Sequence, residues 1–333
     1  MTGASRTDAN RTAADSLDLI RVAPRPTTPA DLPDALRGLW SAAGDDGGDV
    51  TRAVTMNFVA LARDGEMLTE VAERLMRRSP ARAFLLTIDD SLDEPVTAVA
   101  AVLRCSGVSK CRDVLIEEIR IRLPQSWFSH VPGLVRPLLI HDLPTHLYVA
   151  DLFGTDATDP SDWTGSRELA ALRALSDHCV VDSRHFRVPG VQLAAIAELR
   201  ANGPPITDLS TLRLRPWRRA LAEGFERVEW RPGTAVRGIV RHGESGTAAA
   251  ILLAQWLEAK LAARIQLEAS GQDDEPCPES VSLRFCDCEI VVSAGAGCLM
   301  LHVTVHDRCY LPTRLPRSSS GDGDLLAAAI DLA

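Results

Sequence analysis

The chain has 333 residues, and 36 Lys plus Arg against 45 Asp plus Glu give it a formal net charge of −9. Its 46% hydrophobic and 24% charged residues are typical of a folded protein, which excludes wholesale disorder and a collagen-like fibre. Aromatic residues make up only 5% and no basic stripe outweighs the acidic background, so we expect no nucleic-acid partner. At roughly 100 to 200 residues per domain, the length favours two domains.

Three further features bear on where the protein works. No stretch approaches the roughly 18 consecutive apolar residues of a membrane span, so we expect no membrane partner. The first 30 residues alternate Arg and Asp without the apolar stretch of a secretory signal, which favours the cytoplasm. The 8 Cys are sparse in 333 residues, and we expect free thiols rather than a disulfide framework.

The N-terminal part alternates strand and helix patterns. Residues 1–28 are polar and end among prolines, which predicts a disordered arm. Apolar residues at helical spacing predict a helix over 30–44. Strand, helix and strand patterns follow at 54–62, 68–76 and 83–88, and together they indicate a βαβ unit.

The next two strand patterns, 96–105 and 114–123, have no helix between them. We therefore expect part of the sheet to be antiparallel and the sheet as a whole to be mixed. Strand, helix and strand patterns resume at 145–150, 167–175 and 179–182. The last of these ends at Asp182-Ser183-Arg184, the kind of strand end where open α/β sheets usually place their sites.

The rest of the chain carries two helix patterns, then a strand, a long helix, a hairpin and a final helix. The predicted fold is α/β, with a mixed sheet and βαβ units in the N-terminal domain, followed by a smaller α+β C-terminal domain. The predicted parts are a disordered arm over 1–28, an α/β domain over 29–205, a connecting helical segment over 206–230 and an α+β domain over 231–333.

A group of Cys and His near the C-terminus could suggest a zinc site; its members are Cys286, Cys288, Cys298, His302 and His306. A turn at 294–297 would pair Val292 with Leu299, and this register puts Cys286 and Cys288 on an apolar face with both histidines opposite. Because sulfur and imidazole then point apart, we expect no metal and interpret the thiols as packing groups. A zinc-binding module is the alternative that metal analysis would test.

No pattern of a cofactor or catalytic site is complete. Gly243-Glu244-Ser245-Gly246-Thr247 lacks the Lys of a phosphate-binding loop and no G-x-G-x-x-G follows an early strand, so we expect no cofactor. Ser183 lies near Asp182 and His185 but has no nucleophile elbow. Glu117-Glu118 are strand neighbours that face opposite sides, which favours a solvated edge over paired carboxylates.

The concentrated basic patch of the sequence surrounds Pro216-Trp217 and consists of Arg213, Arg215, Arg218 and Arg219. Proline in a first helical turn fits Pro216 at the start of a helix. An exposed Trp217 flanked by arginines would be typical of a protein-interface hot spot. A buried Trp217 with solvated arginines around it is an equally good interpretation.

Five short motifs also occur in an order that is informative about the family. They are Thr55-Met56-Asn57, Ser79-Pro80-Ala81-Arg82-Ala83, Arg136-Pro137-Leu138-Leu139 running into Asp142-Leu143-Pro144, Val180-Val181-Asp182-Ser183-Arg184, and Asp208-Leu209 with Leu214-Arg215-Pro216-Trp217. Their order and spacing resemble the OpcA family of glucose-6-phosphate dehydrogenase assembly proteins over about residues 30–260.

This resemblance implies a protein that is not an enzyme, that binds glucose-6-phosphate dehydrogenase, and that promotes its active oligomer in the oxidative pentose phosphate pathway, with consequences for NADPH supply. It marks seven partner-binding or motif positions: Asp142, Pro144, Asp182, Ser183, Arg184, Arg215 and Trp217. The alternative is a sugar-phosphate-binding enzyme or sensor with its site near Asp182 to Arg184, where Arg184 and Arg215 would hold the phosphate.

Overall fold

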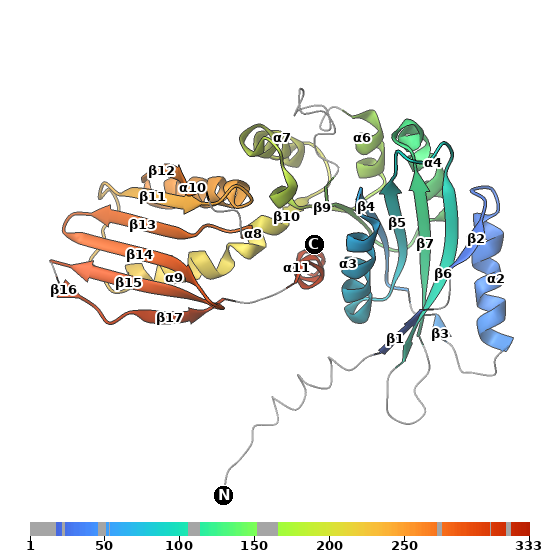
Figure 1. Ribbon diagram of the computed structural model, residues 1–333, viewed down its shortest axis with the longest axis horizontal. Coiled ribbons are helices and arrows are strands. Elements are labelled where there is room, and N and C mark those ends of the chain that lie inside the picture. The colour runs from blue at the N-terminus through green and yellow to red at the C-terminus, as the bar shows by residue number, and fades with distance from the viewer. Residues whose placement is uncertain are drawn as a thin grey trace, which may run out of the picture. The chain divides into compact units, whose positions relative to one another are not determined.

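The computed structural model describes residues 18–21, 24–45, 51–52, 54–105, 114–151, 166–271, 275–306, 308–317 and 321–333 (Figure 1). The chain divides into two units. Unit 1 comprises Met1–Leu152, Ser166–Cys179 and Leu326–Ala333, and unit 2 comprises Phe153–Gly165 and Val180–Leu325. The finer division into two domains and a connecting segment stays a prediction.

The sheet of unit 1 is mixed, which confirms the predicted fold class. Its main strands, in order across the sheet, are β1 (Asp18–Arg21), β6 (Val96–Cys105), β7 (Val114–Leu123), β5 (Ala81–Ile88), β4 (Met56–Ala62), β8 (Thr145–Val149) and β9 (His178–Val181). Strand β4 pairs in parallel with β5 and β8, and β5 pairs in parallel with β7. Strands β6 and β7 are antiparallel, as the missing helix between them predicts.

Every residue of β4 is buried, so the centre of this sheet is covered on both faces. The helical segments of unit 1 are α2 (Leu32–Asp45), α3 (Gly65–Arg78), η1 (Gln125–His130), α4 (Val131–Val135), η2 (Arg136–Leu138) and α6 (Arg167–Ala174). Asp64 caps α3 by accepting hydrogen bonds from the backbone N–H groups of Glu66 and Met67. The apolar side of α3 packs on β4 and β5 and completes the predicted βαβ unit.

Two predictions for unit 1 are wrong in part. Strand β1 and strand β2 (Arg25–Thr27) lie inside the predicted disordered arm and pair with β6; residues 1–17 and 22–23 of that arm lie outside the described residues. Glu117 and Glu118 are fully buried rather than at a solvated edge, because β7 lies between β5 and β6. Arg82 pairs with Glu117, and Arg120 pairs with Glu118 at 2.5 Å. The short strand β3 (Thr51–Arg52) also pairs with β7.

The described part of unit 2 begins with residues 180–181 of β9, and β10 (Ile206–Asp208) follows β9 in the sheet order. Its helical segments are η3 (Ser183–His185), α7 (Pro189–Ala201), α8 (Leu209–Arg213), α9 (Arg215–Phe225) and α10 (Thr247–Leu261). The helix α11 (Asp322–Ile330) starts in unit 2 and its residues from 326 onward belong to unit 1.

A second sheet dominates unit 2 (Figure 1). Its strands, in order, are β12 (Arg264–Ala269), β11 (Arg237–His242), β13 (Ser280–Phe285), β14 (Cys288–Gly295), β15 (Cys298–Val305) and β16 (Arg308–Cys309), and β17 (Thr313–Pro316) also pairs with β15. Strand β12 is parallel to β11, and the pairs from β11 through β13 and β14 to β15 are antiparallel.

Helices α9 and α10 pack on one face of this sheet and form its hydrophobic core. The contact with α9 is close at Gly224, where an added Cβ would lie 2.7 Å from the side chain of Ile290. Along each strand, residues that point into the core alternate with residues on the opposite face. The side chains on that opposite face are mainly polar, as in other sheets that have one face in solvent.

The C-terminal hairpin forms, but its predicted register is wrong by two residues. A tight turn at Ala296 and Gly297, with φ +66° at Gly297, pairs Val292 with Leu301 instead of Leu299. Because the shift is even, the core face keeps its residues. Cys286 does not join that face: it lies in the turn before β14 with φ 50° and is exposed, whereas Cys288 is half-buried.

Candidate functional site

A polar cluster forms where β9 ends, within unit 2. Val180 and Val181 carry the strand through the interior, and Asp182 follows them with 0% exposure. The Asp182 carboxylate accepts a hydrogen bond from the backbone N–H of Arg184 at 3.1 Å and thereby caps η3. The negative charge of Asp182 is therefore buried away from water and needs a cation beside it.

Arg213 supplies that cation. Its Nη1 and Nη2 donate to the two carboxylate oxygens of Asp182, both at 2.7 Å. The Arg213 side chain is only 7% exposed, and this two-pronged geometry is the strongest that arginine and a carboxylate adopt. Nη2 of Arg213 also donates to Asp322 at 2.8 Å, which ties the first turn of α11 to the end of α8.

Arg184 completes the group. Its guanidinium lies 2.8 Å from Asp322 and 3.2 Å from Asp182, and its Nε lies 3.2 Å from the ring of His185. We call Asp182, Arg184, Arg213 and Asp322 the Asp182 cluster. It contains two carboxylates and two guanidinium groups, so its charges balance.

The protonation states of the cluster follow from its contacts. Burial by itself would raise the pKa of Asp182, but Arg213 and then Arg184 outweigh it and the pKa is lowered. The pKa of Asp322 is lowered in the same way, against burial, by Arg213 and Arg184. The pKa of Arg213 is raised, because its two carboxylates outweigh burial. All three groups are charged at neutral pH, and none is placed to exchange a proton.

Asp208 lies behind the cluster and is also buried. It caps α8 by accepting from the backbone N–H of Ser210 at 3.0 Å, and it accepts from that of Ser183 at 3.2 Å. Burial, reinforced by the charge of Asp182, raises the pKa of Asp208 to about 6. The Ser183 side chain is fully buried beside Asp208, so its hydroxyl is not presented to a substrate.

A cavity of about 330 Å³ opens beside the Asp182 cluster. Its lining includes Arg184, Arg213, Asp322, Cys277 and Arg317, and Arg317 pairs with Glu275. Burial raises the pKa of the Cys277 thiol, which keeps it protonated and unreactive. Each arginine of the lining already faces a carboxylate, so the alternative of a sugar-phosphate site near Asp182 to Arg184 gains no support here.

Over the ranges that the structure describes, no helix is long and apolar enough to cross a membrane. The same ranges hold no group of three or more His, Cys, Asp or Glu side chains that could bind a metal ion.

Two adjoining family models match this chain. One, described as the N-terminal domain of a glucose-6-phosphate dehydrogenase subunit, matches residues 72–198, and the other, described as the C-terminal domain, matches residues 204–331. The chain belongs to the OpcA family. The resemblance carried by the five motifs is thereby confirmed.

Two relatives in the OpcA family are both named putative OxPP cycle protein OpcA. The protein of Nostoc punctiforme is 28% identical over 196 residues, which is 57% of this chain and 40% of the relative. The protein of Synechocystis is 24% identical over 200 residues, which is 57% of this chain and 39% of the relative. The chain therefore spans about two fifths of the length of the curated relatives it matches.

Among solved structures, the chain is similar to KijD10, a 3-ketoreductase from Actinomadura kijaniata in complex with TDP-benzene and NADP. The TM-score is 0.45 at 10% identity, with 83% of this chain and 87% of that chain covered. A likeness of this size carries no information about activity.

The OpcA motif positions in unit 1 serve its architecture. Asn57 is fully buried, and its amide nitrogen donates to the carbonyl of Ile140 at 2.9 Å while its amide oxygen accepts from the Ile140 N–H at 2.9 Å. The backbone N–H of Asn57 donates to Pro144 at 2.8 Å. Asp142 and Pro144 are exposed on the turn that Asn57 holds, so their side chains are available to a partner.

The OpcA motif positions of unit 2 differ in accessibility. Trp217 is fully buried in the core under α9, which agrees with the buried interpretation and not with an exposed hot spot. Arg215 is exposed at the start of α9. Asp182, Ser183 and Arg184 lie together in and around the Asp182 cluster, and Arg215 is not part of that cluster.

Sequence reasoning missed two members of the cluster, Arg213 and Asp322. Arg213 was counted only as part of the basic patch, although its place five residues after the helix-capping Asp208 is a usable signal. Asp322 lies 109 residues from Arg213 along the chain, and no local pattern connects the two.

Proposed function

We propose that this protein binds glucose-6-phosphate dehydrogenase and promotes its active oligomer, as a non-enzymatic assembly factor and allosteric activator in the oxidative pentose phosphate pathway. The observation that carries the proposal is the match of both family models, which are described as parts of a glucose-6-phosphate dehydrogenase subunit, over residues 72–198 and 204–331. The names of the two relatives point to the same pathway.

The geometry of the Asp182 cluster supports a structural role for the family's unit 2 motif. Its charged groups neutralise one another, and the hydroxyl of the adjacent Ser183 is buried. A catalytic acid or base needs a pKa near the working pH and access to substrate, and neither Asp182 nor Arg213 has both. The cluster instead fixes β9, α8 and the start of α11 in one arrangement, which is what a preformed binding surface requires.

The mechanism we propose is thermodynamic linkage. A protein that binds the active oligomer of the dehydrogenase more tightly than its other forms shifts the population toward that oligomer by the difference in binding free energy. A tenfold difference in affinity corresponds to about 1.4 kcal/mol, which is enough to change a balanced equilibrium decisively. No covalent chemistry on this chain is needed.

The test is to titrate the purified protein into the cognate dehydrogenase and to record its kcat, KM and molar mass together. We expect the mass to rise toward a larger oligomer and kcat/KM to rise with it, at a defined ratio of the two chains. The matched control is the same protein after heat unfolding. Unchanged kinetics and mass at saturating protein would refute the proposal.

A further inference from the structure

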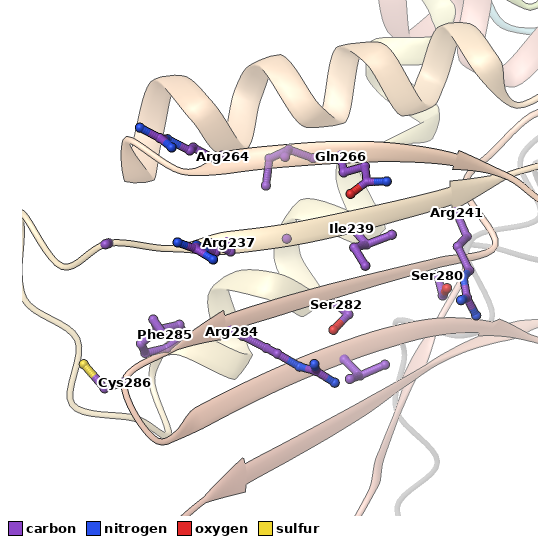
Figure 2. A pocket seen from close by; sticks show the side chains of 14 residues that line it. Arg237, Ile239, Arg241, Arg264, Gln266, Ser280, Ser282, Arg284, Phe285 and Cys286 are labelled. Carbon is purple, nitrogen blue, oxygen red and sulfur yellow. The ribbon is translucent and has the colours of Figure 1, made fainter.

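The solvent-facing side of the unit 2 sheet carries a row of arginines on three adjacent strands. Arg237 on β11 lies directly opposite Arg264 on β12 and directly opposite Arg284 on β13. Figure 2 shows the three side chains across these strands, with Arg241 further along β11. All four arginines are exposed.

The charges on this face are not balanced. Arg284 pairs with Glu289 at 2.7 Å, and Arg241 pairs with Glu268 at 3.1 Å. No carboxylate of the described residues forms an ion pair with Arg237 or Arg264. Like charges directly opposite one another destabilise a sheet, so we expect Arg237 and Arg264 to cost the isolated unit stability.

The centre of the face holds one exposed apolar side chain, that of Ile239. Ile239, at 37% exposure, lies between the arginine row and Arg241, beside Gln266 and Ser282 (Figure 2). A broad depression of about 870 Å³ covers this area, and most of the side chains that line it are exposed. Small-molecule sites enclose their ligands, whereas an apolar centre with a charged rim on an open surface is typical of protein interfaces.

We propose that this arginine face, made of Arg237, Arg241, Arg264 and Arg284 around Ile239, is where an acidic surface of glucose-6-phosphate dehydrogenase docks. The proposal rests on the function proposed above and names the surface that carries it. Charge complementarity is the argument for the occupant: on a chain of net charge −9 the face is a positive exception, and an acidic patch on the partner would be steered toward it.

The experiment reverses the two arginines that lack an ion pair, in the full chain, as Arg237→Glu with Arg264→Glu. Binding to the cognate dehydrogenase is measured by calorimetry at about 50, 150 and 500 mM salt, across which charge screening changes strongly. We expect the double variant to bind at least about tenfold more weakly at low salt and to lose most of the salt dependence that the wild-type protein shows.

The matched control is Arg187→Glu with Arg231→Glu, which reverses two exposed arginines elsewhere in unit 2 and changes the net charge equally. It should bind like the wild-type protein, and thermal unfolding of both variants verifies that they fold. Equal binding by all three proteins would overturn the docking surface and leave the proposed function standing. Failure of the wild-type protein to bind would overturn both.

A second copy of this acidic chain is the other possible occupant, and the same variants test it. Light scattering on the wild-type protein alone should show no dimer that depends on salt. A dimer formed through the arginine face would depend on salt and would be lost in the double variant. Finding such a dimer, with dehydrogenase binding unaffected by the double variant, would overturn the proposal in favour of self-association.

Discussion

At the residue scale, the contact between Asp182 and Arg213 is a buried, two-pronged ion pair whose partners are both nearly inaccessible to water. Removing one partner of such a pair leaves the other charge buried without its counterion, which typically costs about 3–5 kcal/mol. We predict that Arg213→Met lowers the free energy of unfolding of unit 2 by about 3 kcal/mol, because Arg184 still offsets part of the Asp182 charge. Urea unfolding followed by tryptophan fluorescence measures this.

The neighbouring Arg215 provides the control. It is exposed on α9 and outside the cluster, so Arg215→Met should change the free energy of unfolding by no more than about 0.5 kcal/mol. Similar losses in both variants would mean that the buried ion pair does not distinguish Arg213 from its neighbour.

The buried Asp208 should impose a pH dependence on stability. Its pKa is raised to about 6 in the folded protein from 3.8 in a model compound, so the folded state holds the proton more tightly than the unfolded chain. Stability from this group is therefore present below about pH 4 and is lost as the pH rises toward about 6, by at most about 3 kcal/mol.

Asp208→Asn keeps an oxygen to cap α8 but cannot ionise. We predict that urea unfolding of this variant lacks the decline between about pH 4 and pH 6 that the wild-type protein shows. An identical decline in both proteins would assign the titration to another group.

At the same scale, sequence reasoning located part of the candidate site. The end of β9 at Asp182 follows from a buried apolar run that stops at a polar residue, and it could be predicted. The partners Arg213 and Asp322 come from distant segments, and only the folded chain brings them together. The burial of Glu117 and Glu118 was missed because a charged pair on a strand normally marks a solvated face.

At the scale of single elements, we expect the like charges of the arginine row to weaken the pairing of β11 with β12 and β13. Neutralising Arg237 as Arg237→Gln removes like-charge repulsion from both Arg264 and Arg284. We predict that this variant raises the free energy of unfolding by about 0.2–1 kcal/mol, as measured by urea unfolding.

The control on the same strand is Arg241→Gln. Arg241 has Glu268 as its partner, so its neutralisation should give no gain. A gain of equal size in both variants, or a loss in Arg237→Gln, would show that repulsion within the row is not what limits stability.

Elements whose pattern is local were predicted well. Helix α3 between β4 and β5 follows from apolar spacing, and the antiparallel pairing of β6 and β7 follows from the missing helix. The hairpin register was missed because two turns of different length, at 294–297 and at 296–297, place the same residues on the same face. Strands β1 and β2 were missed because their pairing depends on the distant β6.

At the scale of the whole molecule, an acidic chain carries a localised arginine face, and its Asp182 cluster is internally neutral. Both features are compatible with the binding role proposed above. The family match carries the proposed partner, and the balanced Asp182 cluster supports a structural role for the unit 2 motif.

The measurement that tests this account most directly is the molar mass of the cognate dehydrogenase, followed by light scattering as it is diluted through its dissociation range. With saturating protein present, we predict that the larger, active oligomer persists to dehydrogenase concentrations at least about tenfold lower, as linkage to a tightly bound partner requires. The same dissociation curve with and without this protein would contradict the account.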